Sequence, residues 1–176
     1  MKRIAAVFAL LVAFGVSAAQ AQEKASAAAA STTGITNLFH MAHANIVKAA
    51  EQIPEDKYAF QPTKEVRTLG ALFAHIADAN FMFCSMVGGT PGTASAEKTA
   101  KTKAEIVAAL KASYDACGAA YGKITDADLA KPVKIFGRDS NYSGALTFNT
   151  SHNWEHYGNI VTYMRLNGMV PPSSQQ

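Results

Sequence analysis

The chain has 176 residues, of which 49% are hydrophobic, and a formal net charge of +3. A chain of this length can form one well-packed core, so we expect a single folded domain. Lysine and arginine are scattered and form no dense basic run, which argues against a nucleic-acid partner.

The N-terminus has the pattern of a secretory signal peptide. Lys2 and Arg3 precede an apolar run over residues 4–16, and small residues ending at Ala21 suit a signal peptidase. We therefore predict a signal peptide over residues 1–21, cleaved after Ala21, and a periplasmic or secreted protein. The apolar run is shorter than the roughly 18 residues that span a bilayer, so no stable membrane span is expected after processing.

The Ala- and Ser-rich stretch 22–33 predicts a flexible linker. A first helix is expected from about Thr33 to Glu51, where apolar residues recur at spacings of three and four. These residues are Ile35, Leu38, Phe39, Ala42, Ile46 and Ala49.

A second helix is expected to begin after Thr68, a suitable N-cap, and to end at Gly88 and Gly89. Its core face consists of Leu69, Leu72, Phe73, Ile76, Phe83 and Val87. The stretch 88–100, rich in Gly, Thr and Ser, predicts a surface loop.

A third helix is expected after Thr102, because Glu105 stands at the capping-box spacing from it. Its buried side is marked by Ile106, Leu110 and Cys117. Residues 124–141 interrupt the helical pattern with Asp, Pro and Gly around a brief extended stretch, and they offer no convincing strand pair. They predict a long connection.

A fourth helix is expected from a cap at Ser143 to a stop at Asn167 and Gly168. Its apolar positions include Leu146, Phe148, Ile160, Tyr163 and Leu166. The fold class predicted is therefore all-α, a four-helix bundle with long crossover connections over residues 34–172 and a short tail over 173–176.

Cys84 and Cys117 are the two cysteines of the chain. An oxidising compartment permits a disulfide between them, but pairing requires Cα atoms within about 7 Å, and the sequence does not fix that distance. Two buried, unpaired thiols are the simpler expectation.

Three histidines form the candidate metal site. His152 and His156 are four residues apart and project from one face of the fourth helix. His75 lies in the middle of the very apolar second helix, where a satisfied core histidine is the alternative interpretation. Three neutral imidazoles with one open position suit zinc, nickel or ferrous iron, and bundle cores are where facing helices assemble such sites.

Two segments resemble the DinB-like (DinB/YfiT-like) superfamily. They are residues 67–79, RTLGALFAHIADA, and residues 152–168, HNWEHYGNIVTYMRLNG. The resemblance extends from about Thr33 to Pro172. It implies a four-helix bundle with long crossovers and a divalent metal ion held by His75, His152 and His156. Characterised relatives include thiol transferases, a thiol-dependent maleylpyruvate isomerase and candidate hydrolases.

Other polar residues near the triad have weaker claims. Asn159 lies on the ligand side of the fourth helix, Glu155 is about a quarter-turn off it, and Asp78 follows His75 by about one turn. Each is a candidate for supporting a ligand or contacting substrate, with solvated surface as the alternative. His40 and His43 are interpreted as a partly exposed pair rather than a second metal site. No general base stands out, so the catalytic residues are unassigned.

Two functions follow from these observations. The first is a metal-dependent hydrolase or thiol transferase that acts on a small molecule which the sequence does not identify. The second is a non-enzymatic periplasmic binding or scaffold protein on the same bundle. A homodimer is compatible with either, although no exposed apolar face can be located from the sequence.

Overall fold

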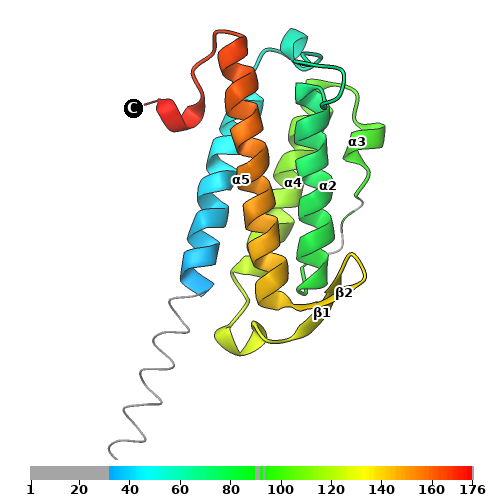
Figure 1. Cartoon of the computed structure of the whole chain (residues 1–176), viewed down its shortest axis with the longest axis vertical. Helices are drawn as coiled ribbons and strands as arrows, with labels where there is room; N and C mark the ends of the chain where they lie inside the picture. The colour runs from blue at the N-terminus through cyan, green and yellow to red at the C-terminus, as the bar shows by residue number, and fades with distance from the viewer. Residues whose placement is uncertain (1–31, 90–91, 93, 176) are drawn as a thin grey trace, which may run out of the picture.

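The computed structural model describes residues 32–89, 92 and 94–175 (Figure 1). The signal peptide predicted for residues 1–21 and nearly all of the predicted linker lie outside the described residues. Residues 32–52 are helical, so the first helix includes the last two linker residues, Thr32 and Thr33. At the other end, the predicted tail contains most of a short 3₁₀ helix, η3 (Pro172–Ser174).

Four long helices dominate the described part of the chain: residues 32–52, α2 (Leu69–Met86), α4 (Lys103–Tyr121) and α5 (Tyr142–Leu166). They lie side by side, and α2 and α4 run in the same direction (Figure 1). The chain between them must therefore return along the length of the bundle, and it forms the short helix α3 (Ala96–Thr99) on the outer side of α2. The predicted all-α bundle with a long crossover is confirmed.

Side chains near the helix ends explain where α2 and α4 begin. The Thr68 side chain accepts a hydrogen bond from the Ala71 backbone N–H at 3.2 Å. Thr102 and Glu105 form the predicted capping box, in which each side chain accepts from the other residue's backbone N–H. These bonds satisfy N–H groups that have no partner within the helix.

The cap predicted for the last helix is wrong by two residues. Asn141, not Ser143, is the N-cap of α5, and its side-chain oxygen accepts from the Gly144 N–H at 2.8 Å. Asn141 is still extended because it ends a strand, so the helix can begin at once after it. Ser143 already lies in the first turn.

The connection before α5 contains a β-hairpin that the sequence did not predict. After the 3₁₀ helix η2 (Asp126–Asp128), β1 (Pro132–Ile135) pairs antiparallel with β2 (Arg138–Asn141). Figure 1 shows the hairpin across one end of the bundle. β1 alternates in burial but has only four residues, and β2 contains no apolar residue, which is why no strand pair could be recognised. A further short 3₁₀ helix, η1 (Glu55–Lys57), follows the first helix.

The core is formed by the apolar faces of the four long helices, and every core position predicted on α2 is buried. Three predicted core residues are instead exposed: Leu38, Phe148 and Leu166. Leu166 is the last residue of α5, and Leu38 lies at the edge of the buried stripe that its neighbour Phe39 occupies. By length and composition α2 could cross a membrane, but most of it is buried inside the bundle.

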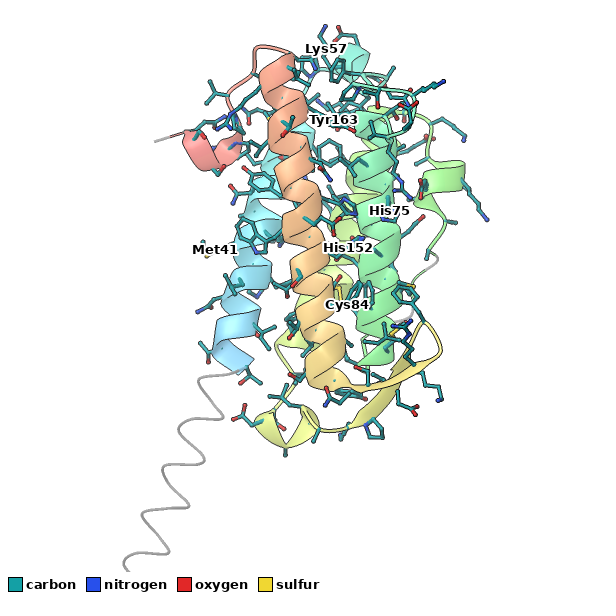
Figure 2. All side chains as sticks on the ribbon, in the orientation of Figure 1. Met41, Lys57, His75, Cys84, His152 and Tyr163 are labelled. Carbon is teal, nitrogen blue, oxygen red and sulfur yellow. A yellow bond between two sulfur atoms is a disulfide. The ribbon has the colours of Figure 1, made fainter. Side chains whose placement is uncertain are left out.

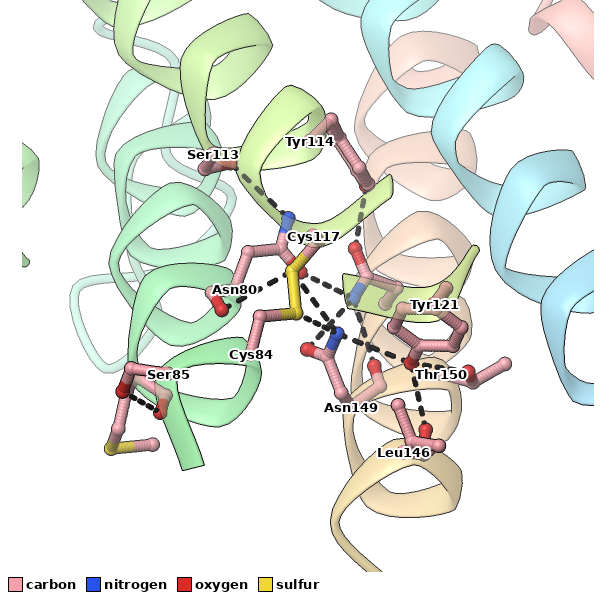
Figure 3. Close-up of a disulfide and its surroundings, with 12 residues drawn as sticks. Asn80, Cys84, Ser85, Ser113, Tyr114, Cys117, Tyr121, Leu146, Asn149 and Thr150 are labelled. Atoms are coloured by element: carbon pink, nitrogen blue, oxygen red, sulfur yellow. Dashed lines mark hydrogen bonds between the residues drawn. A yellow bond between two sulfur atoms is a disulfide. The ribbon is translucent and has the colours of Figure 1, made fainter. Parts of the chain in front are cut away.

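Cys84 on α2 and Cys117 on α4 form a disulfide, with their Cα atoms 5.3 Å apart (Figure 3). The expectation of unpaired thiols is therefore wrong, because the parallel packing of α2 and α4 brings the two positions together. The Asn149 side-chain amide from α5 donates toward both sulfurs, at 3.6 and 3.8 Å. The disulfide thus lies within a buried polar layer shared by α2, α4 and α5.

Candidate metal centre

Three imidazoles converge between α2 and α5. Nε2 of His152 lies 3.2 Å from Nε2 of His75 and 3.0 Å from Nε2 of His156. A set of candidate ligand atoms, one from each ring, lies within 4.8 Å of one another. Figure 2 shows His75 on α2 facing His152 on α5 midway along the bundle. The structure therefore brings together the three residues that the sequence singled out.

The helix register that aligns the histidines is fixed by buried amides. Asn153 follows His152 and points into the core, where its amide donates to the Asn80 side-chain oxygen at 2.9 Å. Asn80 lies on α2, five residues after His75, and both asparagines are fully buried. Because an unsatisfied buried amide is costly, this bond holds α2 and α5 at one register.

The surroundings favour the neutral rings of His152 and His156. Burial lowers the pKa of His152 to about 4, and the neighbouring His156 and His75 add repulsion. Burial, His75 and Arg67 lower the pKa of His156 to about 4. Nδ1 of His152 is buried and has no hydrogen-bond partner in the described part of the chain. The contacts of His152 with the other two histidines are both made by Nε2. Neutral rings with converging nitrogens are the donor set that divalent transition metals require, and the site fits such an ion.

Glu97 is a candidate site residue that the sequence analysis missed. Its Oε2 lies 3.4 Å from Nδ1 of His75, and its Oε1 accepts from Nε of Arg67 at 2.8 Å. Partial burial raises the pKa of Glu97, but the hydrogen bond and charge of Arg67, aided by His75, lower it overall. An ionised Glu97 favours a proton on Nδ1 of His75 and leaves Nε2 free to bind metal.

Glu97 reaches His75 because Asp78 holds α3 in place. The Asp78 carboxylate accepts from the backbone N–H groups of Ala96, at 2.7 Å, and Glu97, at 3.1 Å. These are the first two residues of α3, so Asp78 acts as its cap. The candidate supporting role of Asp78 is therefore indirect: it contacts α3 rather than a histidine.

The remaining predicted polar residues differ in their relation to the triad. The side-chain nitrogen of Asn159 is 3.4 Å from Nδ1 of His156, so it can support that ring. Glu155 is exposed, and its effect on His152 is a minor electrostatic one that favours the protonated ring. His40 is exposed and His43 stacks on Tyr114 at 4.2 Å; neither joins a metal-ligand cluster in the described residues.

Two cavities reach the histidines from different sides. A cavity of about 650 Å³ is lined by His156, Asn159, Arg67 and Tyr163, among other residues. We call it the polar cavity. A second cavity of about 380 Å³, the hairpin cavity, is lined by His75, His152 and apolar residues of α2, α5 and the hairpin turn. The cluster is thus open to small molecules, as a catalytic metal site must be.

The fold and the site define a helical bundle with a three-histidine candidate metal centre. The sequence model of the DinB superfamily matches residues 38–160. The chain belongs to this superfamily.

Solved structures of similar fold agree with this assignment. A DinB-like protein from Bacillus cereus has a TM-score of 0.71 at 21% identity, over 80% of this chain and 95% of that one. A DinB-like protein from Bacillus subtilis has a TM-score of 0.66 at 24% identity, over 81% and 98%. A mycothiol-dependent maleylpyruvate isomerase has a TM-score of 0.62 at 13% identity, over 73% of this chain and 60% of that one. No curated protein matches the chain by sequence.

Proposed function

We propose that this protein is a metal-dependent enzyme, a hydrolase or thiol transferase, that holds a divalent ion with His75, His152 and His156. The observation that carries the proposal is the convergence of three imidazole nitrogens, with Nε2 of His152 3.2 Å from that of His75 and 3.0 Å from that of His156. A ring N–H on Nε2 of His152 can bond only one of its two neighbours at a time, whereas a divalent cation pairs with the lone pairs of all three rings. Zinc, nickel and ferrous iron are the metals that suit such a donor set.

A divalent ion with three protein ligands lowers the pKa of a water or thiol that occupies its open position. Several residues around the cluster favour the neutral, correctly oriented rings that metal binding requires. Glu97 fixes the tautomer of His75, Asn159 supports His156, and burial excludes protons from His152 and His156. The two cavities supply room for a substrate beside the cluster.

Hydrolysis and thiol transfer are favoured by different observations. The structural similarity to a mycothiol-dependent isomerase favours use of a small thiol. The Cys84–Cys117 disulfide and the predicted signal peptide favour an oxidising compartment, where such thiols are scarce, and therefore hydrolysis. Assays of the metal-loaded protein on esters and amides, and on electrophiles with and without added thiol, separate the two reactions.

The metal site is tested by elemental analysis of the purified mature protein. We expect stoichiometric zinc, nickel or iron, and its loss in His152→Ala. His40→Ala is the matched control, because it removes an exposed histidine outside the cluster. Stoichiometric metal in His152→Ala, or none in the native protein after incubation with each ion, would refute the proposal. A stable protein that binds metal but turns over none of these substrates would favour the binding or scaffold function.

Export is tested separately. We propose that the mature protein begins after Ala21 and resides in the periplasm or outside the cell. Mass spectrometry of protein from the periplasmic fraction should give the mass of residues 22–176. Full-length protein in the cytoplasmic fraction would contradict the signal peptide.

A further inference from the structure

We propose that the hairpin cavity binds an apolar group of the substrate, an aromatic ring or a short acyl chain, next to the metal centre. This inference rests on the proposed function, because it places the reacting part of the substrate at the histidines. It adds the chemical class of the molecule that the enzyme accepts.

The cavity is shaped by three phenylalanine rings that reach the triad. Phe83 of α2 lies 5.0 Å from Phe148 of α5, between ring centroids, and 6.0 Å from Phe136 of the hairpin turn. Phe136 and Phe148 are 5.8 Å apart, and the Phe83 ring is 6.2 Å from the ring of His152. These spacings are those of interacting aromatic rings. The three rings therefore form a continuous apolar wall that ends at a candidate metal ligand.

Two of these rings are poorly covered by the protein itself. Phe136 is 67% exposed and Phe148 is 44% exposed. Removing apolar surface from water is favourable, so an apolar ligand that covers both rings gains affinity. Because they border the cavity that contains His75 and His152, a ligand on them also reaches the cluster.

The backbone at Phe136 is an independent indication of function. Phe136 and Gly137 form the two-residue turn of the hairpin, with φ values of 49° and 78°. Such turns favour Asn or Gly at the first position, because positive φ is unfavourable for a bulky side chain. A phenylalanine at this position is unfavourable for the turn itself, and most of its ring is left exposed to solvent. Because Phe136 lines the cavity, we attribute its retention in the turn to ligand binding.

The polar cavity explains how the rest of the substrate is accommodated. It borders His156 and contains hydrogen-bonding groups of Arg67, Asn159 and Tyr163. The hairpin cavity has Asp78 at its edge but is otherwise apolar apart from the two histidines. A substrate that bridges the cluster would thus have its apolar end under the hairpin and its polar end toward Arg67.

The test uses the mature protein labelled with ¹³C at its methionine methyl groups. Met82 lines the hairpin cavity, whereas Met41 lies exposed on the first helix and lines neither cavity, so it serves as an internal control. Titration of the metal-free protein with butan-1-ol and hexan-1-ol should shift the Met82 signal saturably and leave Met41 unchanged. Each buried methylene should tighten binding about fourfold.

Phe136→Asn is the decisive variant. Asn-Gly is a favourable sequence for this turn, so the variant should fold at least as stably as the native protein. It nevertheless removes the ring, and hexan-1-ol should bind at least fivefold more weakly. Met41→Gln removes another exposed apolar side chain, on the first helix, and should bind hexan-1-ol as the native protein does. A role of Phe136 in stability alone predicts the reverse, a lower melting temperature with unchanged binding.

A parallel titration with the zinc-loaded protein compares hexanohydroxamate with acetohydroxamate. The longer ligand should bind more tightly, and Phe136→Asn should remove most of that difference. If zinc does not load, the metal proposal fails but the alcohol titration still decides the cavity. If zinc loads while neither alcohol shifts Met82, or if Phe136→Asn binds hexan-1-ol normally, the cavity proposal is overturned and the metal site stands.

Discussion

A carboxylate oxygen of Glu97 lies 3.4 Å from Nδ1 of His75, the nitrogen that faces away from the histidine cluster. The other oxygen of Glu97 is held by Arg67. A carboxylate in this position orients the imidazole and increases the basicity of the ligating nitrogen. Glu97 thus lies where it can support the candidate metal centre, and it reaches that position from the four-residue helix α3.

Replacing Glu97 with Gln should weaken metal binding about tenfold or more, because the charge that favours the correct tautomer of His75 is lost. Zinc affinity is measured by competition with a chromophoric chelator. Glu65→Gln is the matched control, since it removes the same charge from the rim of the polar cavity without contacting a histidine. Equal affinities of Glu97→Gln and the native protein would show that Glu97 does not act on the site.

Asp78→Ala should loosen α3 and weaken metal binding without changing any ligand. The variant removes the acceptors of the Ala96 and Glu97 N–H groups, and loss of such a cap costs about 1 kcal/mol of stability. Hydrogen exchange at both amides should accelerate. Because Asp78 acts through Glu97, the double variant Asp78→Ala/Glu97→Gln should bind zinc no more weakly than Glu97→Gln alone. Additive losses would indicate a separate role for Asp78 in the hairpin cavity.

The features that the sequence predicted are those encoded by local patterns. Capping at Thr68 and Thr102 depends on residues three positions away, and His152 and His156 are one helical turn apart. His75 could be singled out because a polar ring in so apolar a helix needs a partner. The resemblance to the DinB-like superfamily then placed these three residues in one site.

The features that were missed depend on contacts between distant segments. Glu97 lies in a stretch rich in Gly, Thr and Ser, and nothing near it distinguishes it from a surface acid. The disulfide follows from the parallel packing of α2 and α4, which the helical pattern does not specify. Phe148 has the spacing of a core residue on α5, yet the hairpin beside it leaves a cavity there. A one-dimensional pattern does not distinguish a filled core from a cavity.

The protein should lose stability at alkaline pH. Burial raises the pKa of Tyr121 to about 12 from an ordinary value of 10.0 and outweighs the hydrogen bonds from Thr150 and Asn149, which lower it. The unfolded chain therefore loses this proton first, so the free energy of unfolding should fall as the pH rises from 10 through 12.

Urea unfolding at pH 8, 10 and 11 measures this dependence. Tyr121→Phe should be less stable at pH 8, by about 1 kcal/mol, because it lacks the hydrogen bond to the Leu146 carbonyl. It should also lose less stability between pH 8 and 11 than the native protein. The same loss in both proteins would assign the alkaline effect to the other tyrosines whose pKa values burial raises, Tyr58, Tyr114 and Tyr163.

Removal of the disulfide should lower the free energy of unfolding substantially but should change metal binding little. The bond closes a loop of 33 residues, so the double variant Cys84→Ala/Cys117→Ala should lose about 3–4 kcal/mol of unfolding free energy. Its zinc affinity should change less than twofold, because Asn80 and Asn153 still hold α2 and α5 at the same register. Asn153→Leu should weaken zinc binding, since it breaks the contact that aligns His75 with His152, and it should also lower stability, because the buried Asn80 and Tyr114 side chains each lose a hydrogen-bond partner. Urea denaturation and chelator competition on both variants measure the two effects, and a large loss of zinc affinity in the cysteine variant would mean that the disulfide itself positions the histidines.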